Sequence, residues 1–263
     1  MIMNNEIFVP MEIENSDVTR IILGNAQGKG ARPYQEDSFG FSALDKKSVR
    51  KCGLTAVVSD GMGGLSDGDK VSRYTVTTII EKLSSIDVSY QTLTQFTSLY
   101  NSISQHICTS RYNGGATAST VHCCKKGVFF CSTGDSRIYL YRKNRLYQMT
   151  TDFDYLNSLL NSVLSGDEYL DDALTDPQKD SLDEYIGAKK NLSPDINVKP
   201  FTPLKNDKLL ICSDGVYNAL DDIEIIESLS QSAQEAANDI QLKISYKQYE
   251  NQDNFTAVIL EFV

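Results

Sequence analysis

The 263-residue sequence has no tryptophan, only two histidines, and no apolar run long enough to cross a membrane. A membrane-spanning helix needs about 20 mostly apolar residues, so we expect no membrane association. A zinc site or catalytic triad built on histidine would have to use His106 or His122. Both lie in apolar helical or strand patterns, which favours a structural role over either kind of site.

An excess of positive charge is also missing. Lys and Arg number 25 against 35 Asp and Glu, and the formal net charge is −10. Such a surface repels phosphate backbones and anionic lipids, so nucleic acid and membranes are disfavoured as partners.

The six cysteines include no CxxC pair, and most of them interrupt apolar strand-like runs. We interpret them as small buried thiols in a reducing compartment. The N-terminus lacks the basic and apolar regions of a signal peptide. These features predict a cytoplasmic protein, which we expect to be a monomer.

Hydrophobic periodicity predicts strands at 19–24 and 53–59 and helices over 66–86 and 89–111. Residues 151–190 have the texture of polar helical pieces. The remaining expected elements are an antiparallel meander of strands at 116–124, 127–133, 137–142 and 145–149, strands at 194–200, 207–213 and 254–263, and helices at 221–229 and 232–245. This segregated order, with no repeat or linker, predicts one domain of antiparallel sheets with helices stacked outside.

Aspartates stand at the ends of four expected strands. Asp60 and Asp214 each follow an apolar strand within a Ser-Asp-Gly sequence, Asp135 closes another strand, and Asp253 opens the last one. An isolated Asp-Gly is typical of a hairpin turn, but here each Ser-Asp-Gly leads into a helix. If the strands lie side by side, the carboxylates converge and must bind protons or cations. A ligand set made only of oxygen suits Mg²⁺ or Mn²⁺.

Arg32 precedes the acid pair Glu36-Asp37. On its own this spacing is typical of a surface ion pair, which contributes little to stability. Beside a metal cluster, however, the planar guanidinium is suited to donating two parallel hydrogen bonds to a phosphate group. The combination indicates phosphoryl chemistry.

Six short motifs follow one another along the chain: RPYQED (32–37), SDGMGG (59–64), GATAST (115–120), GDSRIYL (134–140), CSDGVYNAL (212–220) and QDNFTAV (252–258). In this order and spacing they resemble the type 2C metal-dependent protein Ser/Thr phosphatases (the PPM family), in particular the bacterial-like branch. The resemblance implies an α+β fold with a four-layer αββα sandwich, in which two central antiparallel β-sheets are flanked by antiparallel helix pairs. It implies a single phosphatase domain over 1–263, with 151–190 as its flap.

The resemblance also implies two Mn²⁺ or Mg²⁺ ions. Asp60 would bridge both ions. The carbonyl of Gly61 and a water held by Glu36-Asp37 would serve one ion, and Asp214 and Asp253 would serve the other. A water bridging the ions would attack phosphoserine or phosphothreonine in line, without a covalent enzyme intermediate.

Two further roles follow from the resemblance. Arg32 would bind the substrate phosphate, and Asp135 with Asp214 would form a third, weaker metal site. Animal members carry a histidine proposed as general acid where this chain has Met62, which cannot donate a proton. We therefore hypothesise that a metal-bound water near Asp135 protonates the leaving group.

The implied substrates are phosphoserine and phosphothreonine proteins, and a cognate Ser/Thr kinase is a further candidate partner. The flap contains ten acidic and three basic residues, which either favour basic phosphopeptides or form a solvated helical face.

Two other functions stay open. One is a catalytically silent member that binds phosphoproteins or regulates a kinase, although the acids at positions 60, 214 and 253 argue for activity. The other is a different carboxylate-metal hydrolase such as a nuclease, which the negative charge disfavours.

Overall fold

The computed structural model describes residues 7–42, 44–62, 66–85, 93–179 and 181–263. Parts of three expectations lie outside these ranges: residues 86 and 89–92 of the two long helices, residues 63 and 64 of the SDGMGG motif, and Asp180 of the flap.

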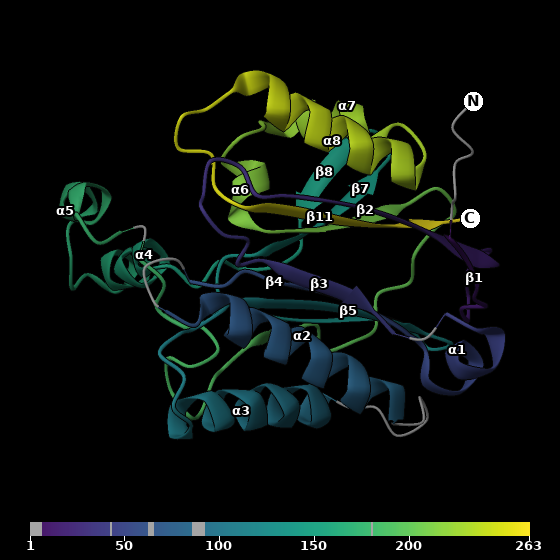
Figure 1. Cartoon of the computed structure of the whole chain (residues 1–263), viewed down its shortest axis with the longest axis horizontal. Helices are drawn as coiled ribbons and strands as arrows, with labels where there is room; N and C mark the ends of the chain where they lie inside the picture. The colour runs from purple at the N-terminus through teal and green to yellow at the C-terminus, as the bar shows by residue number, and fades with distance from the viewer. Residues whose placement is uncertain (1–6, 43, 63–65, 86–92, 180) are drawn as a thin grey trace.

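Two antiparallel sheets packed face to face form the centre of the molecule (Figure 1). The first sheet has the spatial order β1 (Ile7–Pro10), β2 (Arg20–Gly28), β11 (Phe255–Phe262), β10 (Lys208–Cys212), β7 (Arg137–Arg142) and β8 (Arg145–Gln148). The second has the order β3 (Ser38–Phe41), β4 (Leu54–Ser59), β5 (Ala118–Cys124), β6 (Gly127–Thr133) and β9 (Asp195–Ile196). Aliphatic side chains from both sheets, among them Leu23, Val58, Val121, Ile211 and Leu260, fill the space between them.

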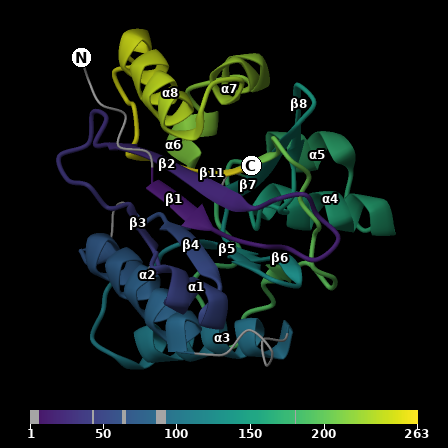
Figure 2. The same ribbon diagram turned by 90° about the vertical axis from the view of Figure 1, so that its right-hand side faces the viewer.

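Helices cover the outer faces of both sheets (Figures 1 and 2). The first sheet packs against α7 (Asp222–Leu229) and α8 (Ala233–Lys247), and the second against α2 (Gly68–Ser85) and α3 (Leu93–Thr109). Because both faces of the second sheet are covered, every residue of β4, β5 and β6 is buried. The expected four-layer αββα sandwich is therefore confirmed.

Four further helices complete the described chain. These are α1 (Lys46–Cys52), α4 (Tyr155–Ser165), α5 (Leu170–Thr175) and α6 (Asp214–Tyr217). Helices α4 and α5 lie in the expected flap and project from the same end of the sandwich as α6 (Figure 1). None of the helices in the described ranges is long and apolar enough to cross a membrane.

The prediction that the four strands between residues 116 and 149 form one antiparallel meander is wrong. Strands β5 and β6 form a hairpin in the second sheet, whereas β7 and β8 form a hairpin in the first. The chain passes from one sheet to the other at residues 134–136, where Gly134 has a φ of 88° that permits the sharp change of direction. The turn expected at Lys143-Asn144 is present, and both residues have positive φ, as a two-residue hairpin turn requires.

The strand expected over 194–200 is reduced to β9. Its pairing with β6 stops at Ile196 because the next side chain replaces the backbone as the partner of β6. Asn197 accepts a hydrogen bond from the Phe130 N–H at 2.8 Å and donates one to the Val128 carbonyl at 3.0 Å. The sequence pattern also missed β1, β3 and α1, which are each too short to show a clear period.

The histidines and cysteines pack within helices and strands as expected, except that one cysteine, Cys108, is exposed. The ring of His106 stacks on Tyr74 at 4.7 Å between centroids, and His122 is fully buried in β5. All six cysteines are free and five are buried, but Cys108 is exposed, which corrects the expectation of six buried thiols.

Burial of His122 predicts a specific pH dependence of stability. Its Nδ1 lies 2.9 Å from Thr55 Oγ1, its Nε2 has no hydrogen-bond partner among the described residues, and burial lowers its pKa to about 4. Between pH 6.5 and 4 the unfolded chain therefore binds a proton that the folded chain does not. The free energy of unfolding should fall by up to roughly 3 kcal/mol as the pH is lowered through this range.

Urea unfolding at several pH values between 4 and 7 measures this effect. Buried carboxyls with raised pKa values titrate in the opposite sense over the same range, so the quantity to compare is the difference between the wild type and His122→Leu. The variant should lose less stability on acidification. Parallel curves for the two proteins would show that His122 is not the group responsible.

Candidate active site

The two sheets bring acidic side chains to the same end of the sandwich. In the second sheet, Asp37 directly precedes β3 and Asp60 directly follows β4, and these strands pair with Ser38 opposite Ser59. In the first sheet, Asp214 follows β10 and begins α6, while Asp253 precedes the neighbouring strand β11. Adjacent antiparallel strands thus contribute two acids from each sheet.

These carboxyls lie close enough to affect one another's ionisation. The pKa of Asp60 is raised well above its usual value, first by burial and then by the charges of Asp37, Asp214 and Asp135. Burial, with a smaller contribution from the charge of Asp253, raises the pKa of Asp37 and of Asp214 to about 6. Buried like charges at this spacing require protons or cations to offset them.

Asp37 provides the clearest test of whether a cation fits. Its Oδ2 accepts hydrogen bonds from Ser213 Oγ and Thr256 Oγ1, both at 2.7 Å, so the carboxylate is fixed. Its Oδ1 is buried and has no hydrogen-bond partner among the residues that the structure describes. A buried unpartnered oxygen is costly unless it binds a water or a cation.

The donor set consists of carboxylate oxygens, which suits Mg²⁺ or Mn²⁺. Within the described ranges, the acidic, histidine and cysteine side chains do not already form a group of three that could hold a metal ion. Asp37, Asp60 and Asp214 nevertheless lie close enough for each to affect the pKa of another. The residues therefore fit a divalent ion in their chemistry and their location.

The glycines of the two Ser-Asp-Gly sequences allow close approach of the backbone. A Cβ on Gly61 would lie 2.5 Å from the Gly68 carbonyl oxygen and 2.6 Å from that of Glu36. A Cβ on Gly215 would lie 1.9 Å from the carbonyl oxygen of Asn254. Neither glycine has positive φ. They are required for packing, and the hairpin-turn interpretation of these two sequences is wrong.

Thr117, in the GATAST motif, holds the backbone of Asp60. Its Oγ1 accepts the Asp60 N–H at 2.9 Å, and its own N–H donates to the Asp60 carbonyl at 2.8 Å. The same Oγ1 lies 2.6 Å from Ser136 Oγ, in the GDSRIYL motif. Two motifs distant in sequence therefore position this aspartate through hydroxyl and backbone groups.

Arg32 lies on the loop between β2 and β3, and 47% of its side chain is exposed. Its Nη2 donates to Asp253 Oδ2 at 2.5 Å, and this hydrogen bond is the largest cause of a raised Arg32 pKa. The arginine thus pairs with Asp253 and not with the acid pair close to it in sequence. Burial raises the pKa of Glu36, which lies half-buried on the same loop.

Asn254 fastens this loop to β11. Its Oδ1 accepts the Glu36 N–H at 2.7 Å, and its Nδ2 donates to the carbonyls of Lys29 and Tyr34 at 2.8 and 2.9 Å. The amide therefore keeps the loop that carries Arg32 next to Asp253.

Asp135 lies on the crossing between the sheets, and burial raises its pKa to about 7. The hydroxyl of Tyr217 donates to its carbonyl at 3.1 Å. Arg137 stacks on the Tyr217 ring, 3.6 Å from its centroid, and binds the Asp152 carboxylate through two nitrogens at 2.6 to 3.1 Å. A stacked arginine and tyrosine thus support the backbone beside Asp135.

Sequence reasoning missed the residues that hold the acids in place: Thr117, Ser213, Tyr217, Asn254 and Thr256. All of them lie inside the six motifs, and two are next to a predicted ligand in sequence. That position was the available signal, but the partners they bind are far away along the chain.

Comparison with known proteins identifies the family of the chain. A profile of the family described as Protein phosphatase 2C matches residues 32–245. The chain is 29% identical to the serine/threonine phosphatase stp of Listeria welshimeri over 247 residues, covering 88% of this chain and 91% of that protein. It is 30% identical over 194 residues to a putative protein phosphatase 2C-type of Streptococcus pyogenes, covering 70% and 76% of the two chains.

Solved structures share the fold. The serine/threonine phosphatase of S. agalactiae superposes with a TM-score of 0.76 at 23% identity, over 92% of this chain and all of that one. Stp1 of Staphylococcus aureus superposes with a TM-score of 0.73 at 21% identity, over 96% and 97%.

Proposed function

Since this chain belongs to the protein phosphatase 2C family, we propose that its converged carboxylates are the active site with which it hydrolyses phosphoserine and phosphothreonine in proteins. The chain is a protein serine/threonine phosphatase, and its family is metal-dependent. The observation that supports this location of the site is the set of coupled, buried carboxyls beside an exposed arginine at one end of the sandwich. A catalytically silent, phosphoprotein-binding role is not favoured.

We propose two divalent ions, Mn²⁺ or Mg²⁺, held by Asp37, Asp60, the Gly61 carbonyl, Asp214 and Asp253, with a weaker third site at Asp135. Glu36, together with Asp37, would hold a water that serves one of the two ions. When bound, such ions make a water more acidic and offset charge on phosphate oxygens.

The residues of the chain supply positioning around that chemistry. Ser213 and Thr256 fix one oxygen of Asp37, and Thr117 fixes the backbone of Asp60. Arg32 has five N–H donors, and its ion pair with Asp253 uses only Nη2. The remaining side-chain donors have no acceptor in the described part of the chain, and on an exposed side chain they can bind two oxygens of a substrate phosphate.

The source of the leaving-group proton, the substrate preference, and the domain organisation and partners of the protein are further predictions. Met62 carries no proton to donate, so the route of the leaving-group proton through a water near Asp135 is a hypothesis. The exposed acids Asp167, Asp171 and Asp172, before and within α5, favour substrates with basic residues beside the phosphate. We also infer a single phosphatase domain that acts as a cytoplasmic monomer, with a Ser/Thr kinase as a candidate partner.

An assay of phosphopeptides tests the proposed function. With Mn²⁺ present, the protein should release phosphate from phosphoserine and phosphothreonine peptides at rates at least about 100-fold above those for phosphotyrosine peptides and above those in chelator. This contrast corresponds to about 3 kcal/mol of transition-state stabilisation. Binding of phosphopeptides without release of phosphate would contradict the proposal and support the silent alternative.

The same panel, with basic or acidic residues flanking the phosphate, tests the role of the flap. Basic flanks should lower KM, because they are attracted by the exposed carboxylates of Asp167, Asp171 and Asp172. Equal rates for the two sets would mean that the acids are only a solvated face.

A further inference from the structure

A cationic pocket lies at the end of the sandwich opposite to the candidate active site. It occupies about 450 Å³ between α1, the end of β1 and the turn joining β5 to β6. In Figure 1, α1 and β1 lie at one end of the two sheets, whereas α4, α5 and α6 lie at the other. Whatever binds in this pocket therefore does not occupy the active site.

Helix α1 concentrates positive charge on an acidic protein. Four of its seven residues are basic, namely Lys46, Lys47, Arg50 and Lys51, and none is acidic. The pairs 46/50 and 47/51 are four residues apart, so their side chains are neighbours on the helix surface and repel each other. None of the four forms an ion pair with any residue that the structure describes. A bound anion would relieve this repulsion.

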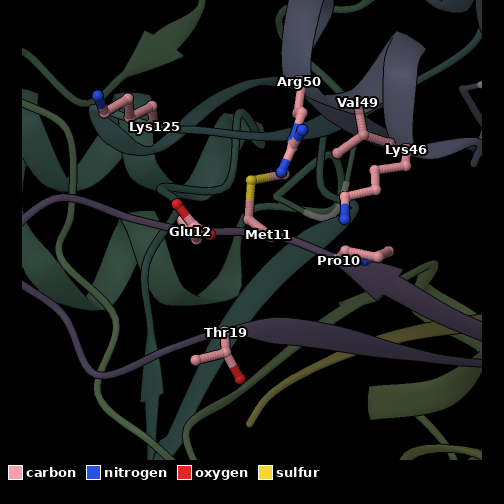
Figure 3. A pocket seen from close by; sticks show the side chains of 8 residues that line it. All are labelled: Pro10, Met11, Glu12, Thr19, Lys46, Val49, Arg50 and Lys125. Atoms are coloured by element: carbon pink, nitrogen blue, oxygen red, sulfur yellow. The ribbon is translucent and has the colours of Figure 1, made fainter.

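The pocket gathers charge from separate segments. Lys46 and Arg50 extend from α1 toward the space above Pro10 and Met11, as Figure 3 shows. Lys125 adds a third cation from the turn between β5 and β6, and its contact with Glu14 is a loose pair at 3.8 Å between exposed side chains. Exposed ion pairs of this kind contribute little to stability, so Lys125 is available to bind another anion.

One carboxylate belongs to the pocket lining. The negative charge of Glu12 offsets one of the three positive charges, so the lining keeps a net positive charge. The carboxylate of Asp45, at the start of α1, is occupied with the N–H groups of Lys47 and Ser48. Buried Val49 and Met11 form an apolar floor.

We propose that this pocket binds a small molecule carrying two or more linked phosphate groups. The volume is in the range of small-molecule sites, which span about 300 to 1,000 Å³. The Lys46 ammonium and the Arg50 guanidinium suit neighbouring phosphate groups, with Lys125 as a further cation at the edge of the pocket, and the guanidinium fork suits phosphate oxygens in particular. A long nucleic acid is excluded as the ligand by the negative charge of the remaining surface.

Isothermal titration calorimetry with inorganic tripolyphosphate tests the site, on the full chain without divalent metal so that no phosphate is released. The wild type should bind one tripolyphosphate, with an affinity that falls as salt is added. The double variant Lys46→Ala/Arg50→Ala should bind at least tenfold more weakly. Lys125→Ala, which leaves α1 unchanged, should weaken binding by a smaller factor. This variant tests the site if the double variant is poorly folded.

A matched control removes the same charge elsewhere. Lys143→Ala/Arg145→Ala alters two exposed residues, one in the turn between β7 and β8 and one at the start of β8, and should bind tripolyphosphate like the wild type. Equal losses in both double variants, or no binding by the wild type, would overturn the proposal. Hydrolysis of p-nitrophenyl phosphate with Mn²⁺ should be unchanged in Lys46→Ala/Arg50→Ala, so failure of this site is distinguishable from failure of the proposed function.

Discussion

Asp60→Asn is expected to lower kcat/KM for a phosphoserine peptide by about 1,000-fold while the protein stays folded. Asp60 is the acid whose ionisation is coupled to Asp37, Asp214 and Asp135 together. Replacing it by an amide removes the charge at the centre of the proposed metal site, and metal ions contribute several kcal/mol to phosphoryl transfer, with about 1.4 kcal/mol for each factor of ten. The measurement is steady-state release of phosphate with saturating Mn²⁺.

Asp207→Asn is the matched control for this variant. Asp207 is 2% exposed and is held in an ion pair with Arg142 at 2.5 Å, away from the candidate site. Its replacement should lower the free energy of unfolding by about 3 kcal/mol, as expected when one partner of a buried pair is removed, but keep kcat near the wild-type value. A similar loss of activity in both variants would mean that stability, and not the charge of Asp60, is responsible.

Mn²⁺ is expected to raise the melting temperature of the wild type by about 5 to 10 °C. The carboxyls of Asp37, Asp60 and Asp214 are buried with raised pKa values, so they repel one another when ionised and a bound cation offsets this cost. At a free ion concentration about 100 times Kd, binding contributes about 2.7 kcal/mol, and each kcal/mol shifts the melting temperature of a chain of this size by about 2 to 4 °C.

Thermal unfolding followed by circular dichroism, with Mn²⁺ or with chelator, measures this shift. Asp60→Asn should lose most of it and Asp207→Asn should keep it. If Mn²⁺ stabilised the wild type and Asp60→Asn equally, the ion would bind somewhere other than among these carboxylates.

The elements that sequence periodicity predicted well are the long ones. The helices over 66–86 and 89–111 correspond to α2 and α3 in the described ranges, and 254–263 corresponds to β11. Their apolar positions repeat over several turns or strand residues, so the period is readable. The four-residue strands β1 and β3 give too few repeats, and β9 ends early because a side chain, Asn197, takes over its pairing.

The sequence by itself determined which residues are candidates for the chemistry. Aspartates at strand ends, a nearby arginine and six motifs in order are local features, and they were sufficient to indicate a carboxylate metal site and a phosphatase. The type of donor atom is a property of the residues and does not depend on how the sheets pack.

Only the tertiary structure decided how these residues meet. Neighbouring strands bring two acids together within each sheet, but the two pairs come from different sheets, so their convergence depends on how the sheets pack. The supporting contacts join residues far apart in sequence, such as Ser213 with Asp37 and Asn254 with Glu36. The cationic pocket likewise requires α1 and the turn at Lys125 to be brought together. Local periodicity carries no information about such contacts, because they arise from the burial of apolar faces across the whole sandwich.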